Sequence, residues 1–368
     1  MFGKLTIYSK HFDWVLFASV LLLICIGLAE IYSIALGQSA IDLLNFQKQL
    51  GFVFFGIILL FAFAFFDYHN LRSYSNYLVL GGVLILVAVL IFGNTIRGTK
   101  GWFSFIGFGL QPVEFVKFIL IVFLARYFSS ASLKIKPLKH LLISFGGVLL
   151  FMALVLAQPD FGSSLILFAI WFAMIILAGF NKKYFIIIFL VLALIMSGSW
   201  FCFFQDYQKE RIMTFLNPSF EPLDQGYNIS QAIIAIGAGG LTGRGLGFGS
   251  QSQLKFLPEA QTDFIFAVVA EELGFFGAFL VLLFFCIFFW RCLSHLRKIK
   301  NDFAVFFILG AASLIFIEMF INIAMNMGLL PVVGISLPFL SYGGSAMISN
   351  LILVGVIESI IIRNNINY

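Results

Sequence analysis

The chain has 368 residues, of which 61% are hydrophobic and 11% charged, and its formal net charge is +5. Soluble domains carry about 25% charged residues, so this composition excludes an ordinary soluble protein and indicates an integral membrane protein. The positive charge does not indicate nucleic-acid binding, because the loop lysines and arginines of a membrane protein mainly set its topology. The four cysteines have no paired spacing, which argues against a disulfide framework.

Long apolar segments recur from one end of the chain to the other. A helix needs about 20 apolar residues to cross a bilayer, whereas a barrel strand shows about 10 alternating ones. We therefore predict an all-α fold in one domain, residues 1–368, a polytopic membrane helical bundle of about ten transmembrane helices. The predicted spans are Trp14–Ala35, Leu50–Phe66, Tyr77–Phe92, Val113–Tyr127, Leu141–Ala157, Ser163–Phe180, Tyr184–Phe204, Phe264–Trp290, Ala304–Met327 and Ser345–Ile362.

The distribution of charge between the loops predicts the topology. With the N-terminus inside, 14 lysines and arginines fall in inner loops and 7 in outer loops. This excess follows the positive-inside rule and predicts that both termini are cytoplasmic. All four histidines then lie on the inner side: His11, His69, His140 and His295. An outer active site would have to use carboxylates for acid–base chemistry.

A long polar, Gly-rich segment separates the seventh and eighth spans, at about residues 205–263. Segments of this kind in membrane proteins commonly carry chemistry or recognition. Arg211 is a candidate phosphate ligand because of its planar fork of donors. Seven glycines surround Arg244 between Gly237 and Gly249, which allows close backbone approach to a ligand, although no Walker motif follows.

Asp263 ends this outer segment, immediately before the eighth span. It is either a cap for the following helix or a partly desolvated carboxylate that takes a proton from an acceptor hydroxyl.

Two further outer motifs carry charge. Glu114 and Lys117 lie three residues apart on one helix face, either as a structural ion pair or with Lys117 available to an anionic ligand. Asp160 lies in a short outer turn, where it either caps the next helix or contacts a ligand.

The remaining polar positions lie near the last three spans. Glu271 and Glu272 are predicted to form structural hydrogen bonds between helices. Glu318 and Asn322–Asn326 precede a charge-free segment with two prolines, Gly328–Gly344, that resembles a loop lining a cavity. Ser341 and Ser345 in this region either bind a pyrophosphate or sugar or are purely structural.

These motifs together resemble the SEDS family (shape, elongation, division and sporulation), of the RodA and FtsW type. The resemblance covers nearly the whole chain in order. The expected lack of a periplasmic appendage and the Gln251–Leu254 run make the chain more similar to the elongation branch than to the division branch, which stays possible. The motifs that carry it are Gln111–Lys117, Gln158–Gly162, Arg211–Pro218, Gly226-Tyr227, Gln231–Gly240, Gln251–Gly274 and Asn322–Gly344.

The resemblance implies a peptidoglycan glycosyltransferase of the bacterial plasma membrane that polymerises lipid II at the outer face. It also implies a class B penicillin-binding protein as transpeptidase partner, and undecaprenyl pyrophosphate as leaving group. Asp263 falls on the family's catalytic aspartate, and Glu114, Lys117 and Asp160 fall on other motif positions. The chain departs from the family pattern at Gly101, Glu318 and Ser336, which weakens the transfer of roles to neighbouring residues.

The expected mechanism has Asp263 as general base, with Lys117 and Arg211, and Arg244 as a further candidate, stabilising the leaving pyrophosphate. No cofactor is assigned. Participation of a divalent cation is left open, because outer carboxylates could bind one but their spacing does not match a known metal-ligand motif. The alternative function is a flippase or transporter for a lipid-linked sugar, whose path Glu114, Lys117 and Glu318 would line. A transporter would need charges at every depth of the membrane, whereas these charges concentrate toward the outer half.

Overall fold

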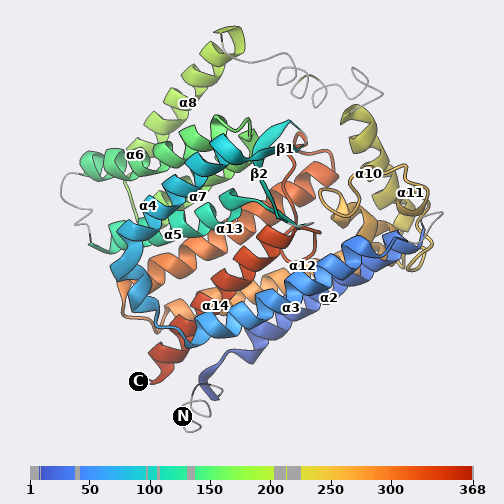
Figure 1. Ribbon diagram of the computed structural model, residues 1–368, viewed down its shortest axis with the longest axis horizontal. Coiled ribbons are helices and arrows are strands. Elements are labelled where there is room, and N and C mark those ends of the chain that lie inside the picture. The colour runs from blue at the N-terminus through green and yellow to red at the C-terminus, as the bar shows by residue number, and fades with distance from the viewer. Residues whose placement is uncertain are drawn as a thin grey trace.

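The computed structural model describes residues 8, 10–37, 42–96, 98–105, 108–130, 137–202, 213 and 225–366, and Figure 1 shows a bundle of long helices. Each of the ten predicted spans overlaps one helix. Among the described residues, seven helices are long and apolar enough to cross a membrane, and α5, α7 and α8 are the three outside that set. The helices are α2 (Trp14–Leu36), α3 (Leu44–Phe65), α4 (Tyr68–Phe92), α5 (Pro112–Ser130), α6 (Pro137–Leu156), α7 (Phe161–Leu177), α8 (Lys182–Cys202), α12 (Ile265–Leu296), α13 (Asp302–Asn326) and α14 (Gly344–Ile366).

Two helices begin well before the apolar runs that predict them. α3 starts at Leu44 and α4 at Tyr68. The carboxylate of Asp67 caps α4 by accepting a hydrogen bond from the backbone N–H of His69 at 3.0 Å. A hydropathy criterion detects only the apolar part of a helix, so it does not detect the polar first turns of α3 and α4.

Helix α14 is the central element of the bundle. Within its most apolar stretch 89% of the residues are buried, and it packs closely along α3 while also contacting α5 and α13 (Figure 1). A Cβ on Gly355 would lie 2.5 Å from the carbonyl oxygen of Leu60, so only glycine permits this approach of the α14 and α3 backbones.

The fold is mostly helical, as predicted, but it also contains a small sheet that the sequence did not predict. After α4 the strands β1 (Asn94–Ile96), β2 (Thr99–Phe105) and β3 (Phe108–Leu110) form an antiparallel sheet in the order β1-β2-β3. The backbone N–H of Lys100 donates to the carbonyl of Gln158 at 3.2 Å, which ties the sheet to the turn between α6 and α7. β1 and β3 have only three residues each, and the seven residues of β2 do not alternate strictly between apolar and polar, so the sequence does not mark them as strands.

The described part of the long segment before α12 contains two helices, α10 (Gln225–Gly239) and α11 (Ser250–Gln253). α10 packs against α12, at the right of the bundle in Figure 1. The prediction of a long loop between the seventh and eighth spans therefore holds only in part, because α10 supplies four helical turns within it.

Helix α12 is broken at Gly274, whose φ is 67° and ψ is −161°. At the break, the carbonyls of Glu271 and Glu272 accept hydrogen bonds from the N–H groups of Arg244 and Gly245, at 3.1 and 2.9 Å. In return, the N–H groups of Phe275 and Phe276 donate to the carbonyls of Gly240 and Leu241. The 240–245 segment thus replaces the backbone partners that a straight helix would supply to itself.

The start of α2 and the end of α14 lie at the same end of the bundle (Figure 1). The N–H of Asp13 donates to Oε2 of Glu358 at 3.0 Å, and the carboxylate of Asp13 accepts from Arg291 and His295 at 2.8 Å each. We call the other end, where α12 and α14 begin and α13 ends, the site end.

Candidate active site

Asp263 lies at the site end, in a tight turn that leads into α12. Three successive backbone N–H groups, from Thr262 to Phe264, donate to the carbonyl of Glu259 at 3.1, 3.1 and 3.3 Å. Phe264 occupies the cap position of α12, and its own side chain makes no capping hydrogen bond. Asp263 directly precedes this cap residue, and its half-buried side chain lies at the site end of the bundle.

The segment between α13 and α14, which we call the 328–343 loop, folds over the same end. A Cβ on Gly334 would lie 3.8 Å from Oδ2 of Asp263, and a Cβ on Gly162 would lie 2.5 Å from the carbonyl oxygen of Val333. Gly334 adopts a φ of 70°, which favours glycine. The loop thus runs from the start of α7 to the carboxylate of Asp263.

Both predicted serines are buried and hydrogen-bonded to protein. The hydroxyl of Ser341 donates to the carbonyl of Thr262 at 2.6 Å and accepts from the N–H of Leu337 at 2.8 Å. The hydroxyl of Ser345 accepts from the N–H of Gln111 at 2.8 Å. Their structural contacts are clear, and their binding of substrate stays a prediction.

Asp160 caps α7, as one of its two interpretations predicted. Its Oδ1 accepts from the N–H of Ser163 at 2.9 Å and its Oδ2 from the Ser163 hydroxyl at 2.8 Å. The side-chain amide of Gln111 approaches Oδ2 at 3.4 Å, which connects Asp160 to the start of α5. Gln111 therefore joins Asp160 and Ser345 in one network.

Lys117 lies deeper in the bundle, between two carboxylates. Its ammonium donates to Glu114 at 2.8 Å and to Glu318 at 2.7 Å, and its side chain is 5% exposed. The hydroxyl of Ser349 donates to the carbonyl of Glu114 at 2.8 Å, which fixes this pair against α14. The group therefore sets two carboxyl groups against one ammonium. Sequence reasoning did not predict that Glu318 completes it.

Arg244 lies apart from this group of residues. It is exposed, and its guanidinium donates to the hydroxyl of Ser250 at 2.7 Å. Its backbone N–H binds the carbonyl of Glu271, about two helical turns along α12 from Asp263. Arg211 and Arg97, the other predicted outer arginines, lie outside the described residues.

Glu271 and Glu272 are structural, as predicted. Glu271 accepts hydrogen bonds from the N–H groups of Gln251 and Ser252, at 2.8 and 3.1 Å. Glu272 accepts from the N–H of Gly247 at 3.0 Å and from the hydroxyl of Ser33. The two buried carboxylates therefore fasten the segment before α12 onto α12 and α2.

The structure thus brings together Asp263, Asp160, Ser341 and Ser345 at one end, with Glu114 and Lys117 below them. Sequence reasoning singled out the Asn322–Asn326 segment but not its contacts with Asp263. The amides of Asn322 and Asn326 both donate to the carbonyl of Asp263, at 2.9 Å each. Their i, i+4 spacing was the available signal, because it places both side chains on one face of α13.

The chemistry available here is that of carboxylates. Among the described residues, no group of three or more His, Cys, Asp or Glu side chains gathers to hold a metal ion. Burial raises the pKa of Tyr342, so this phenol is neutral at physiological pH. Asp263 is the predicted acid–base group that lies beside the glycine-lined loop.

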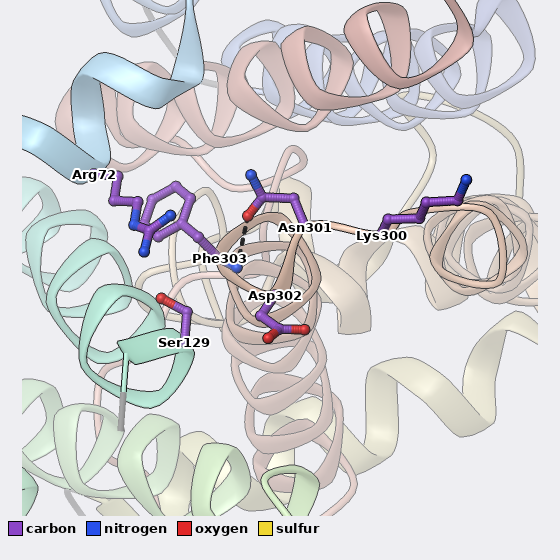
Figure 2. Close-up of a pocket in the computed structure, with 6 residues that line it drawn as sticks. All are labelled: Arg72, Ser129, Lys300, Asn301, Asp302 and Phe303. Carbon is purple, nitrogen blue, oxygen red and sulfur yellow. Dashed lines mark hydrogen bonds between the residues drawn. The ribbon is translucent and has the colours of Figure 1, made fainter. Parts of the chain in front are cut away.

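A cavity of about 390 Å³ lies at the opposite end of α13, lined by Arg72, Ser129, Lys300, Asn301, Asp302 and Phe303. Figure 2 shows Arg72 beside the ring of Phe303, with Lys300 pointing away from the other labelled side chains. The length of α13, 25 residues, separates this cavity from Asn326 by roughly 36 Å. It is therefore not part of the site around Asp263.

Comparison with known proteins gives matches along the whole chain. The model of the FtsW, RodA and SpoVE family, described as "Cell cycle protein", matches residues 13–366. Stage V sporulation protein E of Bacillus subtilis (strain 168) is 36% identical over 366 residues, which cover 95% of this chain and 96% of that protein. Peptidoglycan glycosyltransferase MrdB of Escherichia coli (strain K12) is 35% identical over 361 residues, which cover 97% and 96%.

A solved structure shares the fold. A chain from a study of the structural coordination of polymerization and crosslinking by a peptidoglycan synthase complex matches with a TM-score of 0.80. The match covers 96% of this chain and 98% of that chain at 24% sequence identity. At this identity the likeness establishes the fold alone.

Proposed function

Since the chain belongs to the FtsW, RodA and SpoVE family, we propose that it is a peptidoglycan glycosyltransferase that polymerises lipid II at the outer face of the bacterial plasma membrane. The observation that carries the proposal is the end-to-end match, at 35% identity, to a protein named peptidoglycan glycosyltransferase. The position of Asp263 supports it, because the matched fold places a half-buried carboxylate at the site end.

The proposed orientation has ten spans, with the site end outside and the start of α2 and end of α14 in the cytoplasm. The excess of inner-loop lysines and arginines supports it. We also propose a class B penicillin-binding protein as partner. The fold shared with a chain of a peptidoglycan synthase complex that coordinates polymerization and crosslinking is consistent with such a partnership.

In the proposed reaction, the 4-hydroxyl of the acceptor sugar attacks the anomeric carbon of the donor MurNAc. The bond from that carbon to the pyrophosphate oxygen breaks, so undecaprenyl pyrophosphate leaves, while Asp263 takes the hydroxyl proton. Attack with inversion needs no covalent intermediate. Lys117, Arg211 and Arg244 stay proposed ligands of the pyrophosphate, with Glu114, Asp160, Ser341 and Ser345 as other substrate contacts. The ammonium of Lys117 has three N–H donors, two of which are bound to Glu114 and Glu318, so a direct contact with the pyrophosphate would use the third.

The test is polymerisation of purified lipid II by the chain together with its transpeptidase partner. We expect glycan strands from the wild type and none from folded Asp263→Ala or Asp263→Asn. Asp42→Asn is the matched control, since Asp42 is an exposed carboxylate in the turn before α3 and should keep full activity. Full activity in both Asp263 variants would refute the role of this carboxylate. If the wild type makes no polymer but moves lipid II across the membrane of vesicles, the protein is a flippase and not a glycosyltransferase.

A further inference from the structure

Three consecutive backbone carbonyls next to the proposed base are bound by groups from outside their own helix. The carbonyl of Gln261 accepts from the N–H of Tyr342 at 2.8 Å, and that of Thr262 accepts from the hydroxyl of Ser341 at 2.6 Å. The carbonyl of Asp263 accepts from two asparagine amides at 2.9 Å each. In a continuous helix these carbonyls would accept from the N–H groups four residues later. Their capture ends α12 before it reaches Asp263.

The side-chain amide of Asn326 binds both the acceptor and the donor of one of these helical hydrogen bonds. Its Nδ2 donates to the carbonyl of Asp263 at 2.9 Å, and its Oδ1 accepts from the N–H of Ala267 at 3.1 Å. These two backbone groups are the pair that would bind each other if α12 started one residue earlier, with Asp263 as its cap residue. The Asn326 amide is therefore inserted into the first turn of α12, and it is 0% exposed.

Asn322 strengthens the same arrangement from the preceding turn of α13. Its Nδ2 donates to the carbonyl of Asp263 at 2.9 Å and to the carbonyl of Ile335 at 2.8 Å, and it is 0% exposed. Ile335 follows Gly334, the residue that faces the Asp263 carboxylate. Asn322 thus fixes the distance between Asp263 and the loop that covers it.

We propose that Asn322 and Asn326 are positioning residues that hold the Asp263 carboxylate in place by keeping its peptide outside α12. The inference rests on the proposed role of Asp263 as base. The N–H of Ala267 also donates to the carbonyl of Phe264 at 3.0 Å, so without the asparagine amides it is the carbonyl of Asp263 that loses both of these partners and can accept from this N–H instead. A helix turns about 100° per residue, so including Asp263 in α12 would swing its side chain away from Gly334. Misplacement of a reacting group by about 1 Å can lower a rate about 100-fold.

The first test compares apolar, nearly isosteric replacements. Asn326→Leu and Asn322→Leu should each lower kcat for lipid II polymerisation about tenfold or more, with KM for lipid II within about twofold of the wild type. The matched control is Ser144→Ala, which removes a buried hydrogen bond to Trp171 between α6 and α7 and should leave kcat unchanged. Each variant is assayed in complex with the transpeptidase partner, after its melting temperature has been measured.

A second variant separates positioning from packing. In Asn326→Asp, the introduced carboxyl group can donate to the Asp263 carbonyl only while it holds its proton. The ratio of its kcat to that of the wild type should therefore rise as the pH falls, whereas loss of packing alone would leave Asn326→Leu and Asn326→Asp with parallel pH profiles.

Folded leucine variants with kcat within twofold of the wild type would overturn the inference while leaving the proposed function intact. Polymerisation that survives in Asp263→Asn would instead remove the proposed role of Asp263 as base, on which the inference rests.

Discussion

At the scale of single residues, Lys117 shows how a buried charge is tolerated. Its ammonium pairs with Glu114 and Glu318, and all three side chains are at most 10% exposed. Removing one partner of a buried pair typically costs about 3–5 kcal/mol, because it leaves an uncompensated charge. Substitutions of these three residues should therefore lower the stability of the protein by unequal amounts.

Lys117→Met should destabilise the protein by about 3–5 kcal/mol, because it leaves two buried carboxylates without a cation. Glu318→Gln should cost less, since Lys117 keeps its contact with Glu114. Thermal unfolding in detergent measures both. Equal melting temperatures for the two variants would contradict this ordering.

Asp13, just outside the first span, gives a prediction about pH. Burial alone would raise the pKa of its carboxyl, but hydrogen bonds from His295 and Arg291 outweigh it and lower the pKa from 3.8 to about 2. Because the folded-state pKa is the lower one, this stabilisation is present above about pH 4 and lost as the pH falls to 2. Asp13→Asn should therefore cost about 2 kcal/mol at pH 5 and nothing near pH 2. Unfolding by denaturant at both pH values checks this, and an equal cost at both would refute it.

At the scale of elements, the break in α12 depends on the backbone of two glycines. Gly274 has a φ of 67°, and a Cβ there would lie 2.2 Å from the nitrogen of Gly243, whose own φ is 78°. The exchange of hydrogen bonds between α12 and the 240–245 segment therefore requires glycine at both positions. The break couples the segment before α12 to the helix that follows Asp263.

Gly274→Ala should destabilise the protein strongly, by more than about 2 kcal/mol, and release the 240–245 segment to proteases. Gly81→Ala in α4 is the control, because a Cβ there meets no atom within 4 Å. That change should be neutral or slightly stabilising. Limited proteolysis and thermal unfolding give the two readouts. A Gly274→Ala protein as resistant as the control would show that the break tolerates a side chain.

At the scale of the whole molecule, the two ends of the bundle have different characters. The site end carries the sheet, α10, the 328–343 loop and Asp263, whereas the opposite end carries Asp13, Arg291 and the cavity of Figure 2.

The proposed orientation, with the site end outside, can be tested by cysteine labelling. In a variant with Cys25, Cys202, Cys286 and Cys292 replaced by alanine, Phe248→Cys should react with a membrane-impermeant maleimide in intact cells, and Lys298→Cys should react only after lysis. The reverse pattern would invert the topology.

Sequence reasoning predicted the architecture well because the hydrocarbon requirement is strong and repeats along the chain. Each predicted span overlaps a helix, and Asp263, Asp160 and the two serines do lie at one end. It missed the three strands, because residues 94–110 do not alternate strictly between apolar and polar side chains. It also missed Glu318 as a partner of Lys117, since their distance in the sequence gives no hint of their 2.7 Å contact. Periodicity in the sequence identifies which residues share a helix face, but the packing of the helices decides which faces contact each other.

The buried position of α14 has a consequence for biosynthesis. It follows all other described helices in the chain, yet 89% of its most apolar stretch is enclosed by them. During synthesis, α3, α5 and α13 must therefore enter the membrane before the helix that they surround exists. Until α14 leaves the ribosome, the face of α3 around Gly56 lacks its contact with Leu351 of α14. A nascent chain stalled before Gly344 would be inserted but uncompacted, and the cell's quality-control proteases would recognise it in that state.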